Sequence, residues 1–349
     1  MISKYITEVG YLSYNHVGEQ LCGDHIEVIH PNDDTTILVL ADGLGSGVKA
    51  NILSTLTAKM LSTMIAKNVS IKECVDTIAE TLPVCKERCI AYSTFTIIKV
   101  ENNRFVEIYN YDNPMPFVIS NGKSKDLDWT LKTVDDKKVY HTKLEANLYD
   151  TFVLFSDGVV HAGIGETLNF GWDIPQIKDF LQGLYQKSYS SMSLATSLVD
   201  YCNELYNHRP GDDTTAAVVR IRERSQVNLL IGPASNKDDD EKMLSLFFAK
   251  GGKHIVSGGT TSNIAAKYLH KPLDLALDYI DKEIPPTASI EGVDLVTEGV
   301  ITINRVLDYA KDMLQGKNHS YFDWSYKKDG ASQIAKLLFE EATDINFFV

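Results

Sequence analysis

An apolar segment that ends on Asp-Gly occurs twice in this chain, and it constrains the fold more than any other feature. Residues 37–41 are apolar and lead directly into Asp42-Gly43, and the largely apolar run 148–155 leads into Ser156, Asp157 and Gly158. Short apolar runs bounded by turn residues predict buried strands. A single Asp-Gly is an ordinary turn signal. Its repetition predicts two buried strands that each carry a carboxylate to the end of a sheet.

Two more acidic positions flank strand-like runs. Asp24 precedes the predicted strand 25–29, which a turn joins to the strand ending at Asp42, and Asp212-Asp213 precedes the predicted strand 216–221. An antiparallel hairpin would place Asp24 beside Asp42. Carboxylates gathered in one place repel each other unless cations neutralise them, and hard oxygen ligands suit Mg²⁺ or Mn²⁺. The alternative is that these are four independent Asp-rich turns. All four acidic positions lie at strand ends, however, which favours a site for two ions.

The rest of the chain predicts two domains, residues 1–223 and 226–349, because the charged stretch 222–224 separates two different patterns. The first domain mixes predicted strands with amphipathic helices. Its further predicted strands are 4–14, 91–100, 104–111 and 117–120, and its predicted helices are 45–67, 71–81, 174–185 and 191–207. Ser70 and Glu73 have the spacing of a capping box at the start of the second helix.

Four segments together resemble a known family: Gly23-Asp24, 41–47 (ADGLGSG), 155–159 (FSDGV) and 212–215 (DDTT). The chain resembles the metal-dependent serine/threonine protein phosphatases of type 2C, in the bacterial branch named for the sporulation stage II phosphatase E. The resemblance implies an α+β fold, an α-β-β-α sandwich of two antiparallel sheets, for residues 1–223. It also implies that helices 48–67 and 71–81 are the paired switch helices of this branch.

The resemblance further implies a site for two Mn²⁺ or Mg²⁺ ions and a role for each residue of it. Asp42 would bridge the two ions. The side chain of Asp24 and the carbonyl of Gly43 would bind the second ion, and Asp157 and Asp212 the first. Asp213 is expected in the same site. Many relatives have an amide at this position instead of a carboxylate, so Asp213 is expected to support the ligands.

The sequence also departs from the family. No arginine precedes Arg88, so the phosphate-binding arginine of eukaryotic relatives is missing, and metals, waters and backbone would orient the phosphate. The segment 111–116 differs from the glycine- and histidine-bearing turn common in relatives. His161, four residues after Asp157, is either a general acid or, as is more common for a histidine in such a loop, simply solvated.

Residues 226–349 repeat strand–turn–helix units, which predicts a smaller C-terminal α/β domain with a mostly parallel sheet. Gly258, Gly259, Thr260, Thr261 and Ser262 precede a predicted helix, 263–269, and are expected to form an anion site with Glu298 on the same rim. Ordinary helix capping is the alternative. The aromatic segment 321–326 is expected in the core or at a dimer contact. This domain would regulate the first or dock a partner.

The predicted function is hydrolysis of phosphoserine or phosphothreonine in proteins, by attack of a water that bridges the two metal ions. The resemblance names a phosphorylated anti-sigma-factor antagonist as the usual substrate. The alternatives are a weak or inactive phosphatase-fold scaffold that senses a ligand through its C-terminal domain, and a phosphatase of small metabolites.

A net charge of −13 argues against nucleic acid as a partner. Five cysteines and no apolar leader or membrane-length segment predict a soluble cytoplasmic protein, and a homodimer is compatible with the sequence.

Overall fold

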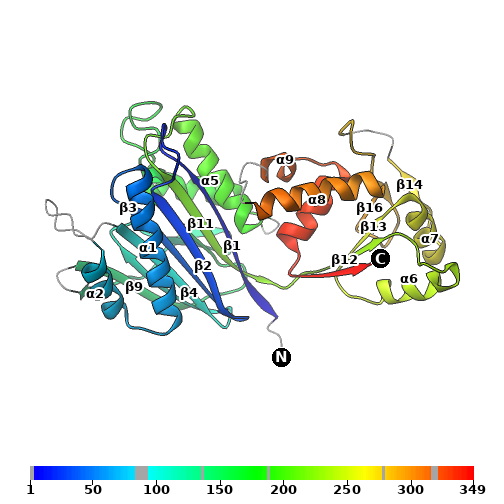
Figure 1. Cartoon of the computed structure of the whole chain (residues 1–349), viewed down its shortest axis with the longest axis horizontal. Coiled ribbons are helices and arrows are strands. Elements are labelled where there is room, and N and C mark those ends of the chain that lie inside the picture. The colour runs from blue at the N-terminus through cyan, green and yellow to red at the C-terminus, as the bar shows by residue number, and fades with distance from the viewer. Residues whose placement is uncertain (1–3, 83–92, 135–136, 187–188, 277–279, 316–320) are drawn as a thin grey trace. The chain divides into compact units, whose positions relative to one another are not determined.

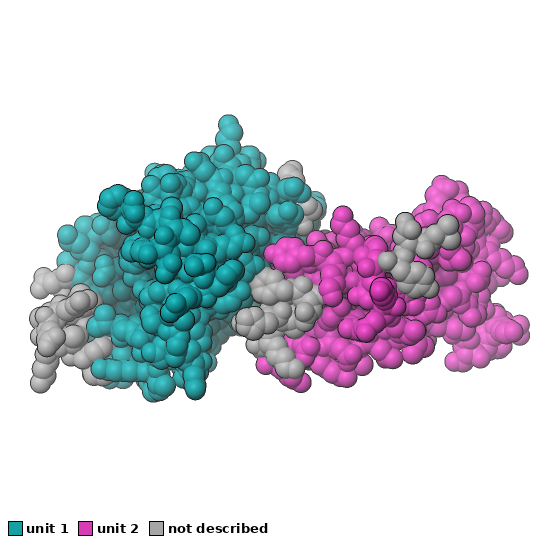
Figure 2. Space-filling view, turned by 90° about the horizontal axis from the view of Figure 1, so that it is seen from above, with its two compact units in different colours: residues 1–223 teal, residues 224–349 magenta. Residues whose placement is uncertain are grey.

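The computed structural model describes residues 4–82, 93–134, 137–186, 189–276, 280–315 and 321–349, so Arg88 lies outside the described residues. The chain divides into two compact units, Met1–Glu223 and Arg224–Val349 (Figures 1 and 2).

The first unit contains two antiparallel sheets. One has five strands in the order β1-β11-β10-β6-β7, and the other has six in the order β2-β3-β4-β5-β9-β8. The five strands are β1 (Tyr5–Tyr14), β11 (Thr214–Glu223), β10 (Thr151–Phe155), β6 (Phe117–Ser120) and β7 (Lys123–Asp126). The six strands are β2 (Asp24–Asn32), β3 (Thr35–Gly43), β4 (Ser93–Glu101), β5 (Phe105–Tyr111), β9 (Lys137–Glu145) and β8 (Thr130–Val134). The sequence did not predict β8 and β9, in which polar and charged residues interrupt the apolar alternation of strands.

Strand β3 belongs to two hydrophobic cores at once. Ile37, Val39 and Ala41 pack in the core beneath the helices, whereas Leu38 and Leu40 pack in the core between the two sheets. Successive strand residues point to opposite faces of a sheet. The apolar run at 37–41 is therefore continuous because both faces of β3 are covered.

Helices cover the outer faces of both sheets, which completes the α-β-β-α sandwich expected from the sequence (Figure 1). Helices α1 (Gly47–Ala66) and α2 (Ile71–Thr81) lie on the six-stranded sheet, and α5 (Ser191–Leu205) lies on β1 and β11 with α4 (Ile174–Leu184) beside it. Ser70 and Glu73 form the predicted capping box of α2. The short helix α3 (Asp157–Val160) follows β10 directly.

The spacing of apolar residues that predicted helix α1 does not identify the face of the helix that is buried. Val48, Ile52 and Leu56 are 60, 52 and 44% exposed, while Ala50 and Ala58 are buried against the sheet. At the start of α1 a small residue faces the sheet because the helix lies very close to it: a Cβ on Gly43 would lie 2.2 Å from the carbonyl oxygen of Ala50. Farther along, Leu61 and Ile65 pack in the core.

The second unit has a six-stranded sheet in the order β14-β15-β16-β13-β12-β17. Four strands are parallel, as expected: β16 (Leu295–Thr297), β13 (Lys253–Ser257), β12 (Gln226–Ile231) and β17 (Asp344–Phe348). Two short antiparallel strands extend the sheet, β14 (Asp274–Leu275) and β15 (Ala288–Ser289). The helical segments are η1 (Lys237–Asp239), α6 (Asp240–Phe248), α7 (Gly259–Leu269), α8 (Val300–Leu314), α9 (Phe322–Ser325), α10 (Gly330–Ala335) and the π-helix η3 (Lys336–Glu341).

Tyr321 and Trp324 of the aromatic segment are buried, with their ring centroids 5.0 Å apart, so these two residues belong to the core of the second unit. Tyr326 of the same segment is exposed. None of the helices in the described parts of the chain is long and apolar enough to cross a membrane.

Candidate metal centre

The hairpin of β2 and β3 brings Asp24 and Asp42 directly opposite each other. Directly opposite residues of an antiparallel pair point to the same face. Asp42 alternates in step with Leu38 and Leu40, so both carboxylates point toward the space between the two sheets. The carbonyl of Asp42 accepts a hydrogen bond of 2.8 Å from the hydroxyl of Ser93, which anchors the end of β3 to β4.

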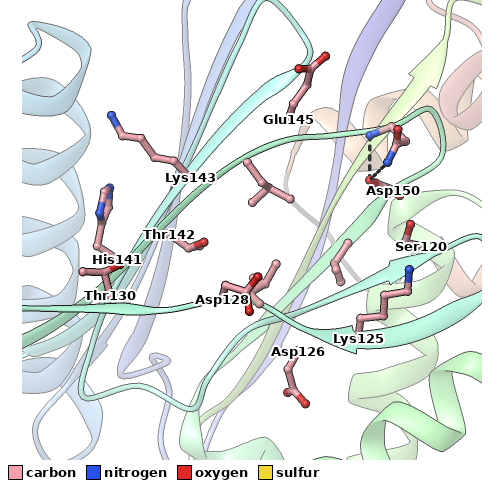
Figure 3. A pocket seen from close by; sticks show the side chains of 14 residues that line it. Ser120, Lys125, Asp126, Asp128, Thr130, His141, Thr142, Lys143, Glu145 and Asp150 are labelled. Carbon is pink, nitrogen blue, oxygen red and sulfur yellow. Dashed lines mark hydrogen bonds between the residues drawn. The ribbon is translucent and has the colours of Figure 1, made fainter.

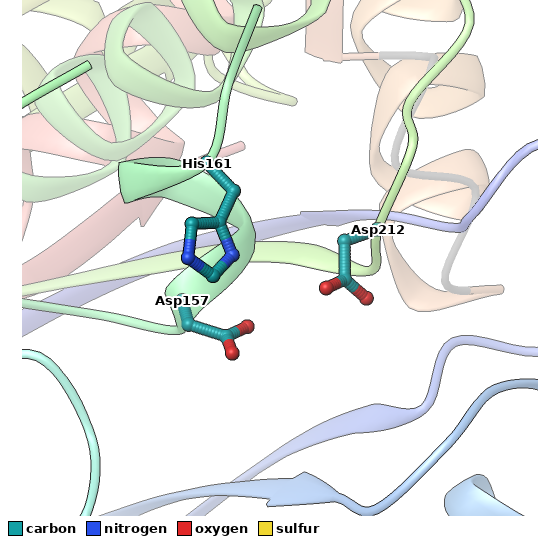
Figure 4. Close-up of side chains that lie close together, drawn as sticks. All are labelled: Asp157, His161 and Asp212. Atoms are coloured by element: carbon teal, nitrogen blue, oxygen red, sulfur yellow. The ribbon is translucent and has the colours of Figure 1, made fainter. Parts of the chain in front are cut away.

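Asp157, His161 and Asp212 form a second cluster, contributed by the other sheet (Figure 4). Asp157 is the first residue of α3, and His161 follows one helical turn later. Asp212 lies just before β11 and faces both side chains (Figure 4). One ligand atom from each of the three residues lies within 4.8 Å of the others. His161, expected to be a general acid or merely solvated, is exposed to solvent but lies beside two predicted ligands.

Ser156 connects the two clusters across the sandwich. Its hydroxyl donates a hydrogen bond of 2.7 Å to Oδ2 of Asp24, and the backbone N–H of Thr215 donates to its oxygen at 3.0 Å. Because Thr215 supplies a donor, the hydroxyl proton is free to point at Asp24. Ser156 is fully buried, so this arrangement is shielded from water. Sequence reasoning missed this residue, although its position directly before Asp157-Gly158 was a signal.

A hydrogen bond from a distant part of the chain also holds the carboxylate of Asp213. The backbone N–H of His16 donates to its Oδ1 at 3.0 Å. A Cβ on Gly23 would lie 2.6 Å from Oδ2 of Asp213, so the glycine before Asp24 is needed for this close approach. Asp24 and Asp213 are 4 and 3% exposed, and one oxygen of each, Oδ1 of Asp24 and Oδ2 of Asp213, has no hydrogen-bond partner among the described residues.

The electrostatics of the cluster favour a bound cation. Burial raises the pKa of Asp42, and the neighbouring carboxylates, first Asp24 and then Asp157, raise it further. Burial likewise raises the pKa of Asp24, against the opposing effect of the Ser156 hydrogen bond. The pKa of Asp212 is raised by burial and by Asp157. Buried, mutually repelling carboxylates with unpartnered oxygens are the donor set that a hard divalent cation requires, so the residues present fit the predicted metal site.

Gly158 and Tyr206 position the second cluster. A Cβ on Gly158 would lie 2.2 Å from the carbonyl oxygen of Asp213, so only glycine allows α3 to start this close to the Asp212-Asp213 turn. The hydroxyl of Tyr206, at the end of α5, donates a hydrogen bond of 2.8 Å to the carbonyl of Gly158. Neither residue was singled out from the sequence for this role.

A separate polar cavity of about 550 Å³ lies at the opposite end of the strands (Figure 3). Its lining includes Lys125, His141, Lys143 and Asp150, and Asp150 immediately precedes β10, whereas Asp157 of the metal site follows that strand. The cavity is therefore distinct from the aspartate cluster.

In the second unit, the segment 258–262 lies at the turn from β13 to α7. The helix begins at Gly259, four residues earlier than expected, and the Ser262 hydroxyl donates to the carbonyl of Gly258 at 2.8 Å. Thr261 and Ser262 are buried. The anion site predicted for this segment stays a prediction.

The two sandwiched antiparallel sheets, their helical layers and the carboxylates at one end define a PP2C-type phosphatase fold. A family model described as "Stage II sporulation protein E (SpoIIE)" matches residues 32–222, more than half of the chain, and the chain belongs to this family.

Solved structures agree with this fold. The chain is similar to the PP2C phosphatase domain with a fragment of the regulatory domain of the cell fate determinant SpoIIE from Bacillus subtilis, at 19% identity and a TM-score of 0.54. That match covers 63% of this chain and 65% of the other, so the chain spans just under two thirds of that structure.

A second structure contains the RsbU and RsbW domains of a Mycobacterium tuberculosis protein, at 14% identity and a TM-score of 0.50, covering 64% of this chain and 62% of the other. At these identities the similarity establishes the fold alone. A search of curated protein sequences found no match.

Proposed function

We propose that this protein is a metal-dependent phosphatase that hydrolyses phosphoserine or phosphothreonine in other proteins. The observation that carries the proposal is the convergence of Asp24 and Asp42 from one sheet with Asp157 and Asp212 from the other, at one end of a PP2C-type sandwich. A purely structural role does not explain it, because ionised carboxylates gathered in this way destabilise a metal-free fold.

Asp24, Asp42, Asp157 and Asp212 would hold two Mn²⁺ or Mg²⁺ ions, together with the carbonyl of Gly43. Divalent cations in such a site supply a nucleophilic water of lowered pKa and neutralise the charge of the phosphoryl group. Asp213 would support this set: its Oδ1 accepts the His16 N–H, and its Oδ2 has no hydrogen-bond partner among the described residues.

Other features of the chain orient the metal ligands and leave the site accessible to a substrate. Ser156 fixes the rotamer of Asp24 through its Oδ2 and leaves Oδ1 for a cation. Asp157 and Asp212 are half-buried and His161 is exposed, so a phosphorylated side chain of a protein has access to this cluster.

The substrate we infer is a phosphorylated protein, and a phosphorylated anti-sigma-factor antagonist is the first to test. Membership of the SpoIIE family and the likeness to a structure that contains RsbU and RsbW domains support this choice. We place the reaction in the cytoplasm, which suits the free thiols of Cys22, Cys74 and Cys202. The unit 224–349 would regulate the phosphatase or dock its partner, as a monomer or a homodimer.

The test is phosphate release from phosphoserine and phosphothreonine peptides and from an aryl phosphate, with Mn²⁺ and with a chelator. We expect Mn²⁺-dependent hydrolysis that Asp42→Asn abolishes. Equal rates for the wild type and this variant would refute catalysis at the site. Mn²⁺ binding without hydrolysis of any peptide or of the aryl phosphate would instead identify a signalling scaffold. Activity confined to small phosphate esters would identify a metabolite phosphatase.

The predicted anion site of the second unit has its own test. Calorimetric titration of the full chain with inorganic phosphate and with nucleotides, in chelator so that the metal centre is empty, should give heat that Thr260→Val reduces. The absence of heat with every ligand would leave protein docking or a structural role for this unit.

A further inference from the structure

His161 lies where a metal ligand would lie. It follows Asp157 by four residues across the single turn of α3, and its backbone N–H donates to the carbonyl of Asp157 at 2.9 Å. Residues four apart on a helical turn share one face. Pairs of ligands at this spacing are a common way for a helix to hold a transition metal.

The ring of His161 is also free to bind. No hydrogen bond from its ring nitrogens to any residue in the described ranges is present, and the residue is exposed. A ring nitrogen and one carboxylate oxygen each from Asp157 and Asp212 lie within 4.8 Å of one another, as ligands around one ion do. Figure 4 shows the imidazole on the same side of α3 as the Asp157 carboxylate, with Asp212 opposite.

Neighbouring carboxylates at this end of the sandwich also have oxygens that no hydrogen bond occupies. Oδ1 of Asp212 accepts the N–H of Asp213 at 2.9 Å, which leaves its other oxygen for an ion. Independently, Asp24 is 4% exposed and its Oδ1 has no partner among the described residues. A buried, unpartnered carboxylate oxygen at the same end of the sandwich indicates that cations complete this site.

We propose that His161 is a nitrogen ligand of the cation held by Asp157 and Asp212, and that it makes this position select Mn²⁺ over Mg²⁺. Imidazole nitrogen binds transition metals well, whereas Mg²⁺ prefers an all-oxygen set. The inference rests on the proposed metal centre but adds a ligand of a different chemical class. It also removes His161 from the role of general acid, because a metal-bound imidazole uses its lone pair on the ion.

The test is pulsed EPR of Mn²⁺ bound to the full chain, combined with Mn²⁺ and Mg²⁺ titrations by calorimetry. Three variants are compared with the wild type: His161→Ala removes the nitrogen, His161→Glu replaces it by a carboxylate of similar reach, and His270→Ala is the matched control. His270 is an exposed histidine of the second unit. Circular dichroism checks that each variant is folded, as expected for substitutions at exposed positions.

We expect a histidine-nitrogen coupling in the Mn²⁺ spectrum of the wild type and of His270→Ala that both His161 variants lose. His161→Ala should bind Mn²⁺ more weakly by on the order of 10–100-fold, the loss typical when a metal site is damaged, with a smaller loss for Mg²⁺. His161→Glu should recover metal binding but shift the preference toward Mg²⁺.

The outcomes separate this inference from the proposed function. Mn²⁺ that binds with no nitrogen coupling, or with a coupling that His161→Ala retains, would overturn the histidine ligand and leave the metal-dependent phosphatase standing. A wild-type protein that binds no Mn²⁺ at all would overturn both.

Discussion

Replacing Asp42 by Asn should make the metal-free protein more stable while it destroys metal binding. Asp24 and Asp42 are directly opposite on β2 and β3, and the Cβ atoms of such pairs are about 4.5–5.5 Å apart. Two ionised carboxylates about 5 Å apart repel by about 3 kcal/mol at an effective dielectric constant of about 20. The raised pKa values allow a proton to relieve part of this repulsion. We therefore expect a gain of about 1–2 kcal/mol in the free energy of unfolding.

The stabilisation by Asp42→Asn should depend on pH, and the raised pKa of Asp42 gives the direction of that dependence. A carboxyl group whose pKa is raised in the folded state binds more protons there than in the unfolded state. Its contribution to stability is present at low pH and is lost as the pH rises through the raised pKa. In chelator, the advantage of Asp42→Asn over the wild type should therefore widen from acid to alkaline pH.

The assay is urea unfolding of the full chain, in chelator and in Mn²⁺, and the transition to compare is the one that Mn²⁺ shifts in the wild type. At a free Mn²⁺ concentration about one hundred times the Kd, the wild type should gain about 2.7 kcal/mol, and Asp42→Asn should gain nothing. The matched control is Asp150→Asn. Asp150 is as buried as Asp24, but its Oδ2 accepts the N–H of Asn147 at 2.8 Å, so this variant should lose stability.

A lower stability of Asp42→Asn in chelator would contradict the account of repulsion at the site. An undiminished response of this variant to Mn²⁺ would contradict the place of Asp42 among the ligands.

Further predictions concern the supports of the site and its protons. Ser156→Ala removes the hydroxyl bonded to a buried carboxylate and leaves the Thr215 N–H unpaired; it should cost about 2–4 kcal/mol in urea unfolding and weaken Mn²⁺ binding in calorimetry. Ser190→Ala, which removes only the N-cap of α5, should cost about 1 kcal/mol and leave Mn²⁺ binding unchanged. Gly158→Ala forces a Cβ against the carbonyl of Asp213; a thermal scan should show a loss of about 1–3 kcal/mol, and an unchanged midpoint would argue against the tight turn. Because the pKa values of three aspartates are raised, Mn²⁺ affinity should increase with pH and binding should release protons, measurable as a dependence of the heat on the buffer's ionisation enthalpy.

Much of the first unit was predictable from local patterns. The apolar run before Asp42 specified a strand buried on both faces, and the hairpin to Asp24 followed from the turn between two such runs. The Ser70–Glu73 spacing specified the start of α2. These features depend on residues a few positions apart, whose geometry the backbone fixes whatever surrounds them.

Local sequence patterns failed where packing against a segment distant in the sequence decides which residues are buried. The apolar spacing of α1 did not identify its buried face, because the closeness of the sheet at Gly43 selects small residues such as Ala50. Strands β8 and β9 were missed because polar and charged residues interrupt the apolar alternation that marks a strand.

The sequence by itself determined which carboxylates this protein has and that they stand at strand ends, because strand periodicity and turn chemistry are local. Only the tertiary structure decided what surrounds them. Ser156 meets Asp24 across 132 positions of sequence, and His161 meets Asp212 because α3 and the turn before β11 lie side by side. The packing of one sheet on the other fixes these contacts, and no spacing along the chain encodes it.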